Sequence, residues 1–385
     1  MDFGFAKDQD LIRKSAREFF EKECPKEKVR ELKDDVKGYD PAMWKKMVKL
    51  GYTGLVIPEE YGGTEGEFVD LMIFMEEVGR NIVPGPFFST VVLCALPIFE
   101  FGTDLQKKKI LSNIAKKGEI WTLALTEHST SHEASDIKLN AVLEGEEYVL
   151  NGTKLFIPYA NVADRFLVVA QTSCLENHEN GITVFLVDAE TEGIHIDVMP
   201  TSARDMRCEI IFDNVKVSKD SILGKTDNGW EIVEYIIQYA AVLKAAEMSG
   251  GAQAVLDIAT RYARERIQFD KPIGSFQAIQ FRLVDLLTEV EGLKYLVHEA
   301  VWKINIGSPS KMLNSIAKAR ANTVYHRVCH HCMVIHGAIG WTEEMDIGLY
   351  HLRTKALEFD GGGSDFHKER IAVELEKHKP AFMTI

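Results

Sequence analysis

Apolar residues recur at three- and four-residue intervals near both ends of the chain and form short alternating runs through its middle. The three- and four-residue spacing is typical of helices that bury one face. It predicts helices over 5–23, 44–49, 68–78, 105–117, 232–264, 276–304 and 312–336, with a shorter one from residue 347.

The middle third has the hydrophobic pattern of a β-domain. Its apolar runs are short, rich in β-branched and aromatic residues, and separated by Asn-Gly, Glu-Gly and Asp-Asn turns, which predicts a sandwich or barrel of mostly antiparallel strands. The runs are WTLALTE, EYVLNGTKLFI, DRFLVVAQT, GITVFLVDAE, GIHIDVMP and CEIIFDNVKV. The sequence therefore predicts an α+β chain with an N-terminal helical domain (1–118), a middle β-domain (119–225) and a C-terminal helical bundle (226–385).

One segment, 82–99, contains no charged side chain and could be taken for a membrane span. It contains Pro84, Pro86 and Pro97, which a lipid-exposed helix tolerates poorly, so we expect a buried connection and no membrane span. The N-terminus lacks the basic-then-apolar pattern of a signal peptide, and the six cysteines form no disulfide pattern. These features predict a cytoplasmic protein.

The net charge of the chain argues against one class of binding partner. With 58 acidic and 45 basic residues, the formal net charge is −13. Such a surface repels phosphate backbones, so we expect no nucleic-acid partner.

The stretch 239–281 carries the most specific pattern. Its first half is a small-residue, apolar helical run, and its second half contains Arg266, Phe269 and Gln277 around a predicted turn. Five segments, taken in order, resemble those of the flavin-dependent acyl-CoA dehydrogenases: GYTGLVIPEEYGG (51–63), LALTE (123–127) followed by ASD (134–136), LNGTKLFIPYANVAD (150–164), RERIQFDKPIGSFQ (264–277) and HGAIGW (336–341).

This resemblance covers nearly the whole chain and implies α,β-desaturation of an acyl-CoA with FAD as cofactor. In that reaction a carboxylate removes the α-proton while flavin N5 accepts the β-hydrogen as hydride. Electrons would then pass to an electron-transfer flavoprotein or a similar acceptor. The positions that match the cofactor-binding segments are Leu123, Leu125, Thr126, Phe156, Pro158, Arg266, Phe269, Gln277, Gly337, Ala338, Gly363 and Asp365, and those that match substrate contacts are Ser135, Ala240 and Gly361.

The sequence departs from the family at both positions that carry the catalytic glutamate. Gly361 stands at the late position, with Asp360 beside it, and Ala240 stands at the alternative position on the first bundle helix. Glu247 lies seven residues beyond Ala240, about 20° away around the helix and about 10 Å along it. A carboxylate on that small, apolar face would be desolvated, as suits a base. We therefore predict Glu247 as the base, with Asp360 as the alternative.

Two other interpretations of Glu247 remain open. It could be a surface residue paired with Lys244, three positions earlier. The chain could also lack a base and serve as a cofactor-binding partner subunit. The segments around Glu247 and GGSDFHKERIA (363–373) are similar to those of bacterial dehydrogenases of ring and steroid-chain breakdown, which are often built from two unlike chains. The assembly predicted is thus a homotetramer or an α2β2 heterotetramer.

Further departures concern the flavin and the acyl group. Phe156 replaces the usual tryptophan beside the flavin, and Pro158, which has no N–H, replaces a residue that donates to the ring. Small residues at 240, 241 and 361–363 suggest a bulky or cyclic acyl group. The cysteines and histidines of HRVCHHCMVIH (326–336) look like metal ligands, but they point in several directions on a helix, and we expect no metal site there.

Overall fold

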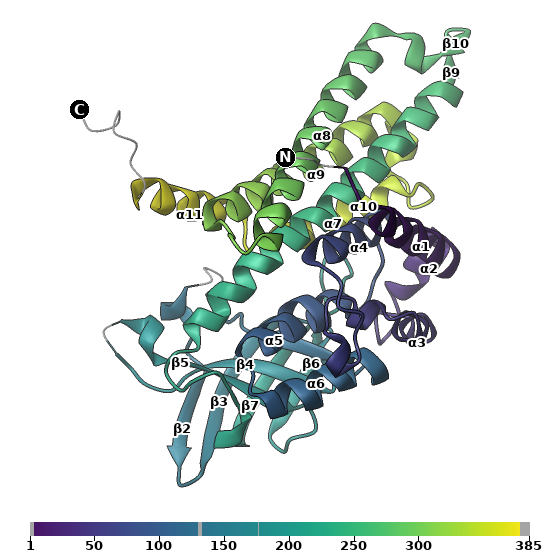
Figure 1. Cartoon of the computed structure of the whole chain (residues 1–385). Coiled ribbons are helices and arrows are strands. Elements are labelled where there is room, and N and C mark those ends of the chain that lie inside the picture. The colour runs from purple at the N-terminus through teal and green to yellow at the C-terminus, as the bar shows by residue number, and fades with distance from the viewer. Residues whose placement is uncertain (1–3, 130–132, 176, 378–385) are drawn as a thin grey trace, which may run out of the picture. The chain divides into compact units, whose positions relative to one another are not determined.

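The computed structural model describes residues 4–129, 133–175 and 177–377, and these pack into two compact units (Figure 1). Of the described residues, the helical unit comprises 4–29, 67–83 and 238–377, and the β-unit comprises 30–66, 84–129, 133–175 and 177–237. The order of elements along the chain is helices, then strands, then helices, which confirms the predicted α+β fold.

The helical unit is built from long helices, as the periodicity predicts. Its elements are α1 (Lys7–Glu23), α4 (Phe68–Asn81), the larger part of α7 (Trp230–Glu265), the β9–β10 hairpin (Ile267–Gln268 and Lys271–Pro272), α8 (Gln277–Asn305), α9 (Lys311–His336), α10 (Ile347–Phe359) and α11 (Ser364–Lys377). The short α2 (Lys26–Leu32) spans the division between the units. α4 is buried along almost its whole length, so it is a core helix of this unit.

Glycines allow α4 and α7 to pack backbone to backbone. A side chain at Gly250 of α7 would overlap the carbonyl oxygen of Glu76 in α4. A side chain at Gly79 of α4 would likewise overlap the carbonyl oxygen of Glu247 in α7. The turn of α7 that carries Glu247 is therefore fixed by direct contact with α4.

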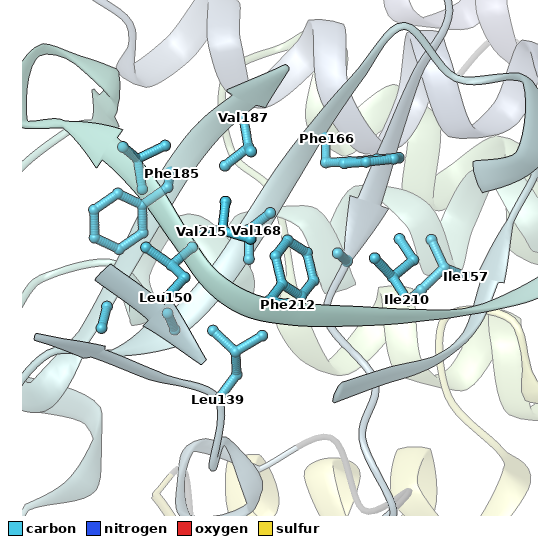
Figure 2. Close-up of a cluster of buried hydrophobic side chains, with 14 of the residues drawn as sticks. Leu139, Leu150, Ile157, Phe166, Val168, Phe185, Val187, Ile210, Phe212 and Val215 are labelled. Atoms are coloured by element: carbon cyan, nitrogen blue, oxygen red, sulfur yellow. The ribbon is translucent and has the colours of Figure 1, made fainter. Parts of the chain in front are cut away.

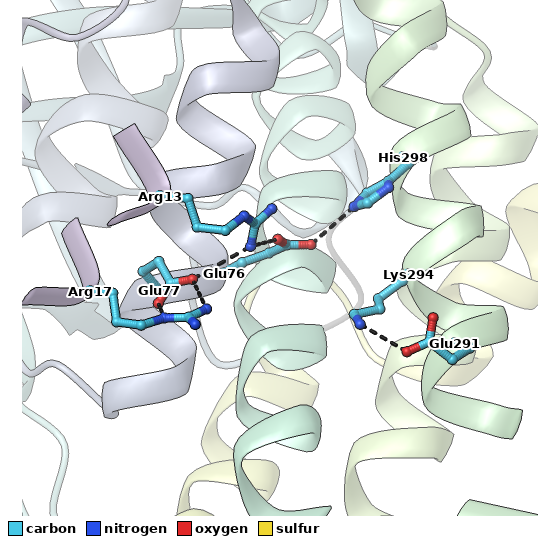
Figure 3. A network of polar contacts seen from close by, with 7 residues as sticks. All are labelled: Arg13, Arg17, Glu76, Glu77, Glu291, Lys294 and His298. Carbon is cyan, nitrogen blue, oxygen red and sulfur yellow. Dashed lines mark hydrogen bonds and ion pairs between the residues drawn. The ribbon is translucent and has the colours of Figure 1, made fainter. Parts of the chain in front are cut away.

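A buried ionic network joins α1 to α4 and α8 (Figure 3). Glu77 accepts two hydrogen bonds from Arg17, at 2.9 and 2.7 Å, and Glu76 contacts Arg13 at 2.7 Å and His298 at 3.2 Å. Burial raises the pKa of Glu76, but the His298 hydrogen bond and the Arg13 charge outweigh it, so the pKa is lowered. The Glu76 carboxylate is thus held in the charged form inside the unit.

The β-unit combines one sheet with short helices. The strands are β1 (Trp121–Ala124), β2 (Asn140–Glu144), β3 (Glu147–Pro158), β4 (Arg165–Gln171), β5 (Ile182–Asp188), β6 (Ile194–Met199), β7 (Arg207–Ser218) and β8 (Ile222–Leu223). The helices that belong wholly to this unit include α3 (Pro41–Lys49), α5 (Leu96–Phe101) and α6 (Asp104–Lys117). The sheet order is β6-β7-β3-β2-β4-β5-β8, and β1 pairs parallel to β4.

Alternating residues of these strands form the core of the β-unit, which includes Phe166, Phe185 and Phe212 (Figure 2). The predicted antiparallel pairing is confirmed for β3–β7, β4–β5 and β6–β7. Strand β2, which pairs antiparallel with β3, was not predicted; only Ala141 of its five residues is buried, and its apolar run is three residues long. The uncharged segment 82–99 is largely buried, as predicted, and becomes a π-helix (Phe88–Ala95) that leads into α5.

Within residues 4–129, 133–175 and 177–377, no helix is long and apolar enough to cross a bilayer.

Candidate functional site

A buried ion pair occupies the α7 face on which the sequence predicts a base. Lys244 Nζ lies 2.7 Å from Glu247 Oε2, and the two side chains are 4% and 8% exposed. The pairing of these residues is therefore confirmed, but not the idea that it is a surface pair. Burial follows from the small residues around the pair and from the close contact with α4. Taking two charges out of water is costly, and the attraction between them offsets part of that cost.

Lys244 also links α7 to the turn that follows α10. Its Nζ lies 3.5 Å from Asp360 Oδ2, and the Asp360 side chain is 19% exposed, more than that of Glu247. The two carboxylates that the sequence offers as bases are therefore brought together by one lysine. Of the two, Asp360 is the more accessible.

A second lysine, which the sequence analysis missed, supports the same turn. Lys318 of α9 is fully buried and donates to the carbonyl oxygens of Leu357 at 2.9 Å and Glu358 at 3.0 Å. It also donates to Asn322 Oδ1 at 2.6 Å. These bonds satisfy carbonyls at the end of α10, where helix geometry leaves them unpaired. Burial lowers the pKa of Lys318 to about 7, although the charge of Asp360 opposes this.

The two positions that usually carry the glutamate are neighbours in space. A Cβ atom at Gly361 would lie 3.5 Å from the backbone nitrogen of Ala241, next to Ala240. Gly361 has φ +72°, a left-handed conformation that favours glycine. The small residues at these positions therefore let the turn pack on α7. Backbone atoms thus fill part of the space that the sequence predicts for a bulky acyl group.

The residues predicted to line a flavin ring lie at the ends of β1 and β3. Thr122 Oγ1 donates to the carbonyl of Pro158 at 2.7 Å, and the Leu155 amide donates to the carbonyl of Thr126 at 2.8 Å. These bonds hold the two strand ends together. Leu123 and Leu125 are buried beside them, and Thr126 and Pro158 are partly buried.

Phe156 gives this edge an apolar wall. Its side chain is 46% exposed, and its backbone has φ +57°, which is rare for an aromatic residue. A large ring left exposed beside buried leucines fits the face of an isoalloxazine. Pro158 offers no backbone donor, whereas Leu125 and Thr126 on the neighbouring strand end each have a backbone N–H. The residues present fit the flavin ring of FAD.

Two other predicted cofactor segments meet at one end of the helical unit. Arg266 and Phe269 lie on the β9–β10 hairpin, where Phe269 is 87% exposed (Figure 1). Tyr262, at the end of α7, stacks on His336 with ring centroids 4.1 Å apart. This stack brings the hairpin close to the C-terminus of α9, where Gly337 follows.

The remaining predicted residues are more dispersed. Gln277 begins α8 beside the hairpin, and Ala338 follows Gly337, whereas Gly363 and Asp365 lie at the start of α11, away from the hairpin (Figure 1). Ser135 lies in a short 3-10 helix, Ala134–Asp136, of the β-unit. Residues 130–132, in the long segment before it, lie outside the described residues.

The cysteines and histidines of 326–336 lie on α9 and are not gathered in one place. Cys329 and Cys332 are buried, and burial raises the pKa of both thiols. Across the part of the chain that the structure describes, no group of three or more His, Cys, Asp or Glu residues is placed to hold a metal ion.

Comparison with known proteins gives a consistent result over the full chain. Models of the N-terminal, middle and C-terminal domains of acyl-CoA dehydrogenases match residues 6–118, 122–215 and 227–375. The 3-(aryl)acrylate reductase of Clostridium sporogenes is 32% identical over 97% of this chain and 100% of its own. The caffeyl-CoA reductase-Etf complex subunit CarC of Acetobacterium woodii is 31% identical over 97% of this chain and 99% of its own. The butyryl-CoA dehydrogenase structure from Megasphaera elsdenii superposes with a TM-score of 0.91 at 29% identity, covering 98% of this chain and 100% of the other.

Proposed function

We propose a reaction for this chain from one established premise: it belongs to the acyl-CoA dehydrogenase family. Members are FAD-dependent oxidoreductases that act on CH–CH bonds of acyl-CoA thioesters. We infer that this chain removes hydrogen from the α and β carbons of an acyl-CoA, or restores it in the reverse direction. A carboxylate of the chain moves the α-proton, and FAD, when bound, exchanges the hydride at the β carbon.

The observation that carries this proposal is the buried group of Lys244, Glu247 and Asp360 beside Ala240. It supplies carboxylates next to the two positions from which the usual glutamate is missing. The sequence ranks Glu247 first, but its carboxylate is 2.7 Å from Lys244 and almost fully enclosed. Asp360 is farther from Lys244 and more exposed, so we assign the proton transfer to Asp360. Glu247 is then the closer partner of Lys244, at 2.7 Å against 3.5 Å for Asp360.

We propose a bulky or cyclic acyl group as substrate. The small residues Ala240 and Gly361 support this only in part, because the turn packs closely on α7. The names of two relatives add support, since 3-arylacrylates and caffeyl-CoA both carry a ring.

An electron-transfer flavoprotein is the proposed redox partner, because one relative is named as a subunit of a reductase-Etf complex. We also propose a tetramer, either of one chain or of two unlike chains. The helical unit leaves large apolar side chains exposed on the β9–β10 hairpin and along α8, as expected of a face between subunits. They include Ile267, Phe269, Phe281 and Val284.

The test is the visible spectrum of the purified chain under anaerobic conditions. Butyryl-CoA, cyclohexanecarboxyl-CoA and 3-phenylpropionyl-CoA are added in turn, and loss of the oxidised flavin band reports reduction. We expect the ring-bearing thioesters to bleach the flavin fastest. Bleaching by butyryl-CoA alone would refute the substrate class, and a yellow protein that no acyl-CoA bleaches would refute the reaction.

Three variants identify the base. Asp360→Asn should slow bleaching by about 10²–10⁴-fold, the range of a lost acid–base group, whereas Glu247→Gln should have the smaller effect. Glu358→Gln is the matched control, because that side chain pairs with Lys355 outside the group. If Glu247→Gln slowed bleaching more than Asp360→Asn, the base would be Glu247. A colourless chain that takes up FAD only with a second, related chain would instead indicate a partner subunit.

A further inference from the structure

A buried ion pair in the β-unit has no part in the chemistry described above. Lys154 of β3 is fully buried, and its Nζ lies 2.7 Å from Glu127 Oε1 and 3.0 Å from the carbonyl oxygen of Leu125. Burial lowers the pKa of Lys154 to about 8, against the opposing effect of the Glu127 charge. A charged lysine inside a β-domain is costly, and an apolar residue of the same size would fill the space as well. Packing alone therefore does not explain why a lysine and a glutamate are buried at these positions.

Glu127 joins two points of the chain that are separated by a long segment. Its carboxylate accepts hydrogen bonds from the backbone amides of Lys138, at 2.9 Å, and Leu139, at 3.0 Å. The chain leaves the sheet region at Glu127 and returns at Lys138. Both ends of this segment are thus fixed at one carboxylate, which Lys154 neutralises.

This clamp, defined as Glu127, Lys154 and the amides of Lys138 and Leu139, is anchored in the core of the β-unit. Leu139 is 1% exposed and packs in the buried cluster with Leu150 (Figure 2). The Leu155 amide bonds the carbonyl of Thr126, next to Glu127. The main chain from Leu125 to Glu127 is therefore held on both sides by groups that belong to the sheet.

We propose that Lys154 is a positioning residue for the flavin, acting through Glu127 and the Leu125 carbonyl on the backbone from Leu125 to Thr126. This rests on the flavin contacts in the proposed function. Main-chain donors bind a ring well only when their positions are fixed before the ring arrives. Because Pro158 has no backbone N–H, the end of β3 offers one main-chain donor fewer, and the position of the Leu125–Thr126 backbone matters more.

The test compares FAD binding by the full-length apoprotein of the wild type with that of a double variant, Glu127→Gln with Lys154→Met. The double change removes both charges, so no buried charge is left unpaired. We expect FAD to bind about tenfold more weakly or worse, because each lost charge-assisted hydrogen bond to the segment weakens its hold on the backbone. We also expect the bound flavin band to shift. Lys216→Met is the matched control, since this lysine of β7 is exposed and lies outside the clamp, and its FAD affinity should equal that of the wild type.

A purely structural pair would give a different result. The double variant would then lose thermal stability while binding FAD with the affinity and spectrum of the wild type, and this would overturn the proposal. Hydrogen exchange on the wild-type apoprotein decides the matter if the double variant does not fold. Slow exchange of the Lys138 and Leu139 amides before FAD is added supports the proposal. Fast exchange that slows only with FAD means that the flavin orders the segment, and refutes it.

Neither measurement needs an acyl-CoA. A failure of the proposed reaction would appear only in the bleaching assay, so the two proposals fail separately.

Discussion

Gly250 of α7 lies against the backbone of α4, and replacing it with alanine tests how far the position of Glu247 depends on that contact. The new methyl group would overlap the carbonyl oxygen of Glu76. A carbonyl in a helix cannot rotate away, so α4 and α7 must separate locally by about 1 Å or more to restore van der Waals contact. The residues of α4 that face this crossing are buried, and they would lose contacts as it opens.

The expected cost follows from two opposing contributions. Overpacking a dense core costs about 1–3 kcal/mol, and alanine regains about 1 kcal/mol of helix propensity relative to glycine. Because the overlap is with backbone, we expect the overpacking cost to reach the upper end of its range. Gly250→Ala should therefore lower the free energy of unfolding by about 2 kcal/mol.

Gly292→Ala in α8 is the matched control. Among the residues that the structure describes, nothing beyond the adjacent residues and nearby helix backbone lies within 4 Å of a Cβ atom at Gly292, so this variant should gain about 0.5–1 kcal/mol from helix propensity alone. Urea unfolding followed by circular dichroism measures both variants, and the rate of flavin reduction by acyl-CoA measures the displacement of Glu247. A Gly250→Ala protein as stable as Gly292→Ala would refute the close crossing of α4 and α7.

Two further predictions concern buried charges. Lys318 has a lower pKa in the folded chain than when unfolded, so the unfolded state binds more protons above about pH 7 and stability rises with pH from there to about 10. Relative to Lys318→Met, the wild type should gain up to about 1.4 kcal/mol per pH unit in urea unfolding across that window, and a constant difference would contradict the lowered pKa. Arg17→Met removes both hydrogen bonds to buried Glu77 and should cost about 3 kcal/mol, whereas Lys14→Met, whose pair with Glu18 is exposed, should change the unfolding free energy by less than about 0.5 kcal/mol. Equal unfolding free energies for the last two variants would show that the Arg17–Glu77 contact contributes nothing.

Periodicity predicts the elements whose burial is regular. The predicted helix 312–336 agrees closely with α9, because its buried positions recur at three- and four-residue intervals. The run DRFLVVAQT becomes β4, in which five consecutive residues are buried, so a short continuous apolar run predicts this strand. Strand β2 is not predicted from the hydrophobic pattern because it buries only one side chain. Its backbone hydrogen bonds to β3 hold it in the sheet. A strand that is held mainly by backbone hydrogen bonds needs no regular pattern of apolar side chains, so the pattern does not predict it.

The candidate site is predicted less completely. The small, apolar face around Glu247 correctly indicates that this carboxylate is buried. The link through Lys244 to Asp360 joins residues more than one hundred positions apart, and helical periodicity carries no information over such a distance. Lys154 and Lys318 carry no sequence signal of burial, since their partners include backbone carbonyls 29 and 39 positions away and, for Lys154, a glutamate 27 positions away.

The way Glu127 fastens both ends of the segment that follows it has a consequence for how such a protein can change over evolution. Loop-closure entropy grows only slowly with length, so three added residues between fixed ends cost about 0.3 kcal/mol. The segment from Glu127 to Lys138 has both ends bonded to one carboxylate, which Lys154 of β3 neutralises. Insertions and deletions between these two ends can change the length of the segment while the strands keep their register, so this is a place where the chain can vary at little cost to folding.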